Sequence, residues 1–233
     1  MLTNSNNLNS GHRKRLRSKF LHGNGKALHD YEKLELLLTY SIPRRDVKPL
    51  AKQLLIRFGS IQNIMNATVE ELTEIKGISE NSAALILLVK ELCTVYLEEK
   101  LIGKNIIRNL SDAVNFARMK IGGYHKETYM VILLDARNGI IHYECFTQGT
   151  INHTTIYTRE IIELALKHHA ASIILIHNHP TGIVMPSAED LNATVKIIKA
   201  LKPMDIELFD HIIVSASDFY SMAAKGDLPK IRI

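Results

Sequence analysis

The most constraining feature of the sequence is an apolar run at residues 172–176 that leads directly into His177-Asn178-His179-Pro180. The run predicts a buried strand, and residues i and i+2 of a strand point to the same face. His177 and His179 can therefore present two imidazoles together. A loop at residues 181–186 can fold back and bring Asp190 to them as a third ligand. Two histidines and one carboxylate suit a zinc ion at about 2.0–2.2 Å with a fourth position left for water, which is the catalytic pattern.

Ser187 and Asp190 also have a simpler interpretation. The sequence Pro186-Ser187-Ala188-Glu189-Asp190 is typical of a helix start, in which Ser187 is the N-cap and Asp190 reaches back as in a capping box. The two interpretations are compatible, because the first turn of a helix can aim a side chain at a metal. The combination of two alternating histidines, a turn and a carboxylate favours a metal site over coincidence.

The positive charge of the chain is concentrated near its start. Residues 1–60 hold twelve Lys and Arg against four Asp and Glu, whereas the whole chain of 233 residues has a formal net charge of +5. This local excess is compatible with an anionic partner such as nucleic acid. We expect the polar residues 1–11 to form a disordered arm.

The composition also bears on the cellular compartment. The sequence shows neither a signal peptide nor a run of eighteen or more apolar residues, so we expect a cytoplasmic protein with no membrane contact. Cys93 and Cys145 are far apart and lack the Cys-x-x-Cys spacing of a metal or redox site. They are expected to be reduced, buried thiols.

Residues 12–100 are predicted to form an all-helical domain. Thr68 is expected to cap one of its helices, with Glu71 as the capping-box partner. The following turn, Gly77-Ile78-Ser79, resembles a helix-hairpin-helix turn, whose backbone N–H groups meet a DNA phosphate. Ser79 replaces the second glycine of that turn, and several glutamates lie nearby. Packing of a helical hairpin is therefore as well supported as DNA binding.

Residues 111–233 are predicted to form an α/β domain after a linker at residues 101–110. Strands and helices alternate there, which indicates three layers around a mixed sheet. The expected strands are 128–134, 140–146, 172–176 and 207–214, and the expected helices are 112–121, 157 or 158 to 169, and 187–201.

The proposed ligands stand in a pattern that resembles the JAB/MPN (JAMM) metalloprotease motif, His-x-His-Pro followed by Ser-x-x-Asp. The fuller string, residues 177–182 with Ser187 and Asp190, is similar to that of the bacterial RadC family. The likeness covers nearly the whole chain and extends to Glu144, Gly149-Thr150, Arg159-Glu160 and Asp210-His211-Ile212-Ile213-Val214. Cys145 and Thr158 depart from it, because a second acidic residue and a proline are usual at these positions. The resemblance implies a helix-hairpin-helix-like N-terminal domain and a C-terminal JAB/MPN, cytidine-deaminase-like α/β/α domain with a mixed sheet.

The resemblance also implies a function. It implies a hydrolase of the JAMM metallopeptidase type that uses one zinc ion, held by His177, His179 and Asp190, to cleave amide or isopeptide bonds of a protein or peptide substrate. The family places its catalytic glutamate, the expected base, at Glu144. Ser187 is assigned to oxyanion stabilisation, for which one donor is typically worth about 2.7–4 kcal/mol in acyl transfer.

A second hypothesis is a nucleic-acid-binding or nuclease protein associated with DNA repair, in which residues 12–90 contact DNA. The family's historical association with repair favours it, but phosphodiester cleavage often uses paired metals and more carboxylates. Among the remaining histidines, His168 and His169 are expected to be structural at a helix end, and His153 has no assigned role. Asp210-His211 could supply a contact to a ligand imidazole, because ligating imidazoles usually donate their other N–H to an acceptor, although packing in the strand is the favoured interpretation.

Overall fold

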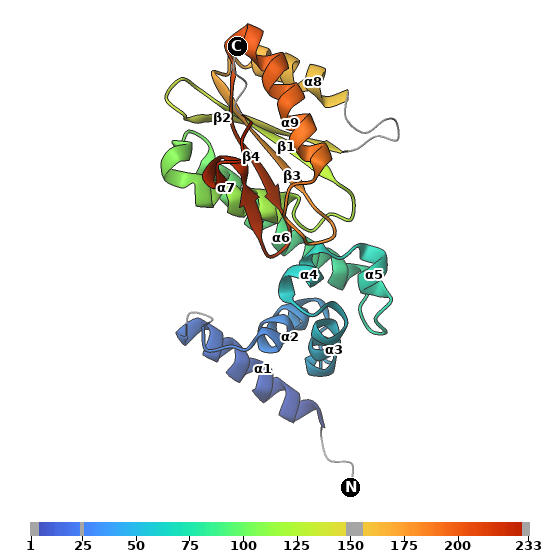
Figure 1. The fold of residues 1–233 in the computed structure, drawn as a ribbon. Helices are drawn as coiled ribbons and strands as arrows, with labels where there is room; N and C mark the ends of the chain where they lie inside the picture. Colours follow the sequence, from blue (N-terminus) through green and yellow to red (C-terminus); the bar gives the residue numbers. More distant parts are fainter. Residues whose placement is uncertain (1–4, 24–25, 148–155, 230–233) are drawn as a thin grey trace. The chain divides into compact units, whose positions relative to one another are not determined.

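Two compact units divide the chain in this computed structural model, Met1–Leu92 and Cys93–Ile233. The structure describes residues 5–23, 26–147 and 156–229 (Figure 1). Gly149-Thr150 and His153, which the sequence singled out, lie outside these described residues. The boundary between the units falls within helix α6 (Glu80–Leu101), and each unit is described by itself. The expected burial of Cys93, which lies in this helix, was wrong, because its side chain is exposed. None of the described helices combines the length and the apolar character that spanning a bilayer requires.

The first unit is built from helices, as predicted. They are α1 (Ser5–His22), α2 (Asp30–Ser41), α3 (Lys48–Phe58), α4 (Ile61–Asn66), α5 (Val69–Thr73) and the first part of α6. Leu38, Leu54 and Leu72 are completely buried in their shared apolar core. Helix α1 begins at Ser5, within the segment for which the sequence predicted a disordered arm.

The turn between α5 and α6 forms the predicted helical hairpin. The hydroxyl of Thr68 accepts the N–H of Glu71, and the carboxylate of Glu71 accepts the N–H of Thr68, so this capping box is confirmed. Gly77 has a φ of +107°, a conformation that side-chain-bearing residues rarely adopt. A Cβ at Gly77 would lie 3.2 Å from Nη1 of Arg45. The turn thus combines a glycine of positive φ with an adjacent guanidinium.

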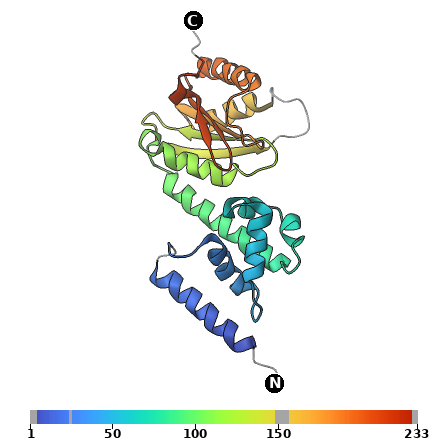
Figure 2. The ribbon, with the colours of Figure 1, turned by 60° about the horizontal axis from the view of Figure 1, so that its bottom comes forward.

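The second unit is a three-layer α/β domain, which confirms the predicted fold class. Its sheet has the order β2-β1-β3-β4-β5, with β3 and β4 parallel and the other neighbours antiparallel. Figure 2 shows the sheet between α7 on one side and α8 and α9 on the other. The elements are α7 (Ile106–Lys120), β1 (Thr128–Leu134), β2 (Ile140–Thr147), α8 (Ile156–Lys167), β3 (Ser172–Asn178), α9 (Ala188–Leu201), a 3-10 helix (Lys202–Met204), β4 (Glu207–Val214), β5 (Phe219–Ser221) and α10 (Met222–Lys225).

Strand β3 lies at the centre of this sheet, and all of its residues are buried. Ile174 and Ile176 pack in the core on the α7 side, whereas Ile173 and Leu175 pack in the core on the side of α8 and α9. His177 continues the second series, because side chains alternate along a strand. The fold therefore directs His177 toward α8 and α9.

Residues 101–110, where the sequence suggested a linker, take part in the fold of the second unit. Leu101 and Ile106 are buried in the core on the α7 side. The N–H of Gly103 donates to the carbonyl of Ile140, and the N–H of Ile140 donates to the carbonyl of Lys104. The polar sequence at 103–105 concealed this packing, because its backbone bonds to a hairpin that is distant in sequence.

Candidate metal centre

The end of β3 and the start of α9 bring the three predicted ligands together. His177 lies in β3, His179 follows the strand, and Asp190 lies in the first turn of α9. The Nε2 atoms of His177 and His179 are 3.0 Å apart. Asp190 Oδ1 is 3.1 Å from Nε2 of His177, and Asp190 Oδ2 is 3.3 Å from Nε2 of His179. The loop between β3 and α9 therefore folds back as predicted.

These spacings fit one small cation. Ligand atoms of a tetrahedral site with bonds of about 2.0–2.2 Å lie about 3.3–3.6 Å from one another, close to the 3.0–3.3 Å found between the three side chains. Two imidazole nitrogens and one carboxylate oxygen form a donor set that zinc accepts. Within the described parts of the chain, no other group of three His, Cys, Asp or Glu side chains converges in this way.

Each imidazole is held through its second ring nitrogen. Nδ1 of His179 lies 2.6 Å from the carbonyl oxygen of Ile183, so Nδ1 carries a proton and Nε2 faces Asp190. Nδ1 of His177 lies 2.9 Å from Nε2 of His211, a completely buried residue of β4. The favoured interpretation of His211 as a packing residue was incomplete, because the structure puts it in direct contact with a proposed ligand.

The electrostatics of the centre keep the carboxylate ionised. Burial acts to raise the pKa of Asp190, but the adjacent imidazoles of His177 and His179 lower that pKa far below its ordinary value. The hydrogen bond with Asp190 raises the pKa of His179, against the effect of burial. The ionised carboxylate could therefore meet either a metal cation or a proton held on His179.

Ser187 is the N-cap of α9, as the capping-box interpretation predicted. Its hydroxyl donates to Oδ2 of Asp190 at 2.7 Å and accepts the N–H of Asp190 at 3.1 Å. The backbone N–H of Ser187 donates to the same Oδ2 at 2.8 Å. Ser187 therefore orients the carboxylate that faces the two imidazoles, and its role at an oxyanion stays a prediction.

Glu144 lies on the same sheet face as His177 but outside the group of ligands. Val131 of β1 is the register partner of both Glu144 and Leu175, so β1 separates Glu144 from β3. The Glu144 side chain is half exposed, and its Oε2 lies 3.9 Å from Nε2 of His142. The ring of His142 stacks on that of His168, with centroids 4.1 Å apart. The role of Glu144 as the base stays a prediction.

Glu127 is a carboxylate near the centre that the sequence analysis missed. It immediately precedes β1, and Tyr129 of β1 is the register partner of His177. The hydrogen bond with Asp190 is the main cause that raises the pKa of His179, and the charge of Glu127 makes a smaller contribution in the same direction. A single glutamate before a strand forms no local pattern, and only the pairing of β1 with β3 brings it to the ligands.

Asn178, between the two histidines, holds the segment that contains Glu127. Its side chain is completely buried, and Oδ1 accepts the N–H of Thr128 at 2.7 Å. Its Nδ2 donates to the carbonyls of Tyr124 at 2.9 Å and Lys126 at 3.2 Å. The two histidines and the intervening asparagine therefore serve different purposes, since the imidazoles form the centre and the amide fixes residues 124–128.

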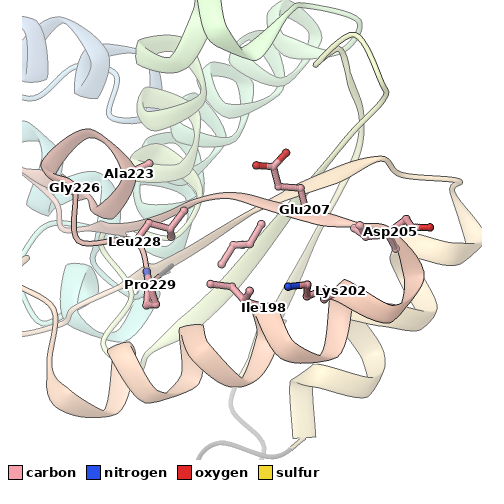
Figure 3. A pocket seen from close by; sticks show the side chains of 10 residues that line it. Ile198, Lys202, Asp205, Glu207, Ala223, Gly226, Leu228 and Pro229 are labelled. Atoms are coloured by element: carbon pink, nitrogen blue, oxygen red, sulfur yellow. The ribbon is translucent and has the colours of Figure 1, made fainter. Parts of the chain in front are cut away.

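A pocket of about 660 Å³ lies elsewhere in the second unit (Figure 3). It is lined by α9, the start of β4 and residues 223–229, with apolar side chains such as Leu208 and Leu228 beside the charged Lys202 and Glu207. None of the three proposed ligands lines it. The pocket is thus a feature distinct from the metal centre.

Comparison with known proteins finds relatives along most of the chain. The RadC-like JAB domain family matches residues 107–227, and the UPF0758 N-terminal family matches residues 9–84. A UPF0758 protein of Fusobacterium nucleatum is 37% identical over 225 residues, which cover 94% of this chain and 97% of that protein. A UPF0758 protein of Ruegeria pomeroyi is 36% identical over 217 residues, which cover 93% of this chain and 97% of that protein. A UPF0758 protein of Paraburkholderia phytofirmans is 36% identical over 210 residues, which cover 90% of this chain and 81% of that protein.

Proposed function

Because this chain belongs to the family of proteins with a RadC-like JAB domain, we propose that its second unit is a zinc-dependent hydrolase of amide or isopeptide bonds. The observation that supports the proposal is the convergence of three side chains, in which the two imidazole Nε2 atoms lie 3.0 Å apart and each lies 3.1–3.3 Å from one carboxylate oxygen of Asp190. A bound ion would supply Lewis-acid activation of water and of the substrate carbonyl.

The reaction also needs a base and a hydrogen-bond donor to the substrate carbonyl oxygen, which side chains around the centre would supply. A base must take a proton from the attacking water and return it to the nitrogen that leaves when the C–N bond breaks. Ser187 is the proposed donor to the carbonyl oxygen as negative charge develops on it. For this role, the hydroxyl of Ser187 would donate to the substrate oxygen instead of Oδ2 of Asp190. The backbone N–H of Ser187 would still donate to Oδ2.

Two glutamates are candidates for the base. The family resemblance implies Glu144, which lies beside His142 and is separated from β3 by β1. The position of the chain favours Glu127, because Asn178 of β3 bonds to the residues on either side of it, Lys126 and Thr128. We therefore propose Glu127 as the base, with Glu144 as the alternative.

Substitution of each glutamate by glutamine tests this proposal. Glu127→Gln should retain zinc, because no ligand is removed, and should lower kcat about 10²–10⁴-fold, the usual contribution of a general base. Turnover would be measured on a library of quenched fluorescent peptides and isopeptides, and zinc content by plasma mass spectrometry. Glu163→Gln is a matched control, because Glu163 is exposed on α8 and pairs with Arg159.

The outcomes separate the alternatives. Loss of turnover with zinc retained in Glu144→Gln, and not in Glu127→Gln, would make Glu144 the base. His177→Ala should lose the zinc itself, because it removes a ligand. A zinc-loaded wild-type protein that cleaves no amide bond in the library would contradict the proposed function.

A further inference from the structure

A chain of three buried side-chain contacts connects two of the proposed ligands behind the metal centre. Nδ1 of His177 lies 2.9 Å from Nε2 of His211, and Nδ1 of His211 lies 2.6 Å from Oγ1 of Thr194. Oγ1 of Thr194 lies 2.6 Å from the main-chain carbonyl oxygen of Asp190. His177, His211 and Thr194 are all 0% exposed, so water supplies no alternative partner to any of them.

The carbonyl of Asp190 fixes the direction of the first hydrogen bond. A carbonyl oxygen can only accept, so Thr194 must donate its single hydroxyl proton to it. The sulfur of Met222 is a weaker acceptor and lies farther from Oγ1, at 3.8 Å. Toward His211, therefore, Oγ1 of Thr194 can only accept, and Nδ1 of His211 must carry a proton.

The remaining ring nitrogens follow from the state of His211. A charged imidazole at this position would be buried without a carboxylate among its hydrogen-bond partners, which is costly. In the neutral ring Nε2 is an acceptor, so Nδ1 of His177 donates to it. Nε2 of His177 is then left with a lone pair that faces His179 and Asp190.

We propose that Thr194 and His211 are positioning residues that select the tautomer of His177 in which Nε2 can bind a metal ion. The inference rests on the proposed metal centre. The chain begins at the backbone of one ligand, Asp190, and ends on the ring of another, His177. Correct folding of the first turn of α9 thus both delivers the carboxylate and determines which nitrogen of His177 is free.

Thr194→Val tests the proposal, because valine keeps the shape of threonine and removes its hydroxyl. Without that hydroxyl, His211 can carry its proton on Nε2, and His177 must then carry its own proton on the nitrogen that faces the metal. We expect zinc affinity, measured by competition with a chromogenic chelator, to fall about 10–100-fold, as for other partners that orient a metal ligand. Thr194→Ser keeps the hydroxyl and should bind zinc as the wild type does.

A spectroscopic measurement checks the tautomer without any enzyme activity. In metal-free wild-type protein at alkaline pH, ¹⁵N NMR should show His177 protonated at Nδ1 and His211 protonated at Nδ1. In metal-free Thr194→Val, His177 should show a substantial fraction protonated at Nε2. A purely structural role of Thr194 would lower stability without changing the tautomer.

Two results would overturn the inference: His177 protonated at Nε2 in the wild type, or equal zinc affinity in the valine and serine variants. If the wild type binds no zinc, the proposed function fails, and the NMR result still decides the tautomer. If Thr194→Val does not fold, the wild-type spectrum alone tests the inference.

Discussion

At the scale of single residues, a proton on His179 would compete with the proposed metal ion. The hydrogen bond with Asp190 is the main cause that raises the pKa of His179, so this imidazole holds a proton to a higher pH than an ordinary histidine does. A metal ligand must be deprotonated, and metal binding therefore releases this proton. The affinity of the centre for a metal must then depend on pH in a defined direction.

We expect zinc affinity to weaken as pH falls through the raised pKa of His179, beginning above the ordinary value of 6.5. The metal-free protein binds one more proton than the zinc-bound protein below that pKa, so affinity should drop about tenfold per pH unit. Competition titrations with a chelator across the neutral range would measure this slope. His142→Gln should leave the profile unchanged, because His142 stacks on His168 away from the ligands. An affinity independent of pH from neutral to mildly acidic conditions would contradict the prediction.

At the scale of secondary structure, the start of α9 serves both the helix and the centre. Ser187 caps the helix and holds the carboxylate of Asp190. Ser187→Ala removes both hydroxyl contacts, so we expect a loss of about 0.5–2 kcal/mol in the free energy of unfolding together with weaker zinc binding. Urea unfolding and chelator competition would measure the two effects.

Ser60→Ala is the matched control for that variant. Ser60 caps α4 in the first unit through the N–H of Asn63, so it should cost a similar amount of stability and leave zinc affinity unchanged. If Ser187→Ala keeps its stability and its zinc but loses turnover, the oxyanion role would outweigh the capping role.

The elements that sequence alone could predict are those with a local signal. The strand at β3, the capping boxes at Thr68 and Ser187, and the ligand spacing of the two histidines and Asp190 depend on residues near one another in the chain. Glu127 and His211 could not be placed in this way. Each reaches the centre through pairing of distant strands, β1 with β3 and β3 with β4, and no short pattern encodes that pairing.

At the scale of the whole molecule, the proposed ion belongs to the second unit alone. All three ligands, with Ser187 and His211, lie between residues 93 and 233, and the chain divides near Leu92. Contact of residues 12–90 with DNA stays a prediction, for which Arg45 beside Gly77 is the local support. The salt dependence of DNA affinity in wild type and Arg45→Ala would check it, since loss of a phosphate contact makes that dependence less steep.

Zinc should therefore stabilise one unit selectively. At a free concentration one hundred times Kd, binding contributes about 2.7 kcal/mol, which corresponds to a rise in Tm of about 5–10 °C for a domain of this size. Hydrogen exchange should slow in β1, β3 and β4 and stay unchanged in α2 and α3. Asp190→Asn should abolish the difference, and equal protection of both units by zinc would contradict the assignment.

The position of His211 on β4 has a consequence for how the protein is made. All three ligands leave the ribosome before His211 does, so a nascent chain can hold the complete donor set while the ring of His177 is still free to adopt the unsuitable tautomer. The proposed role of His211 therefore predicts that high-affinity loading follows synthesis of the last long strand and its pairing in the sheet. On this proposal, metal acquisition would be a late, post-translational event and not a template for folding of the emerging polypeptide.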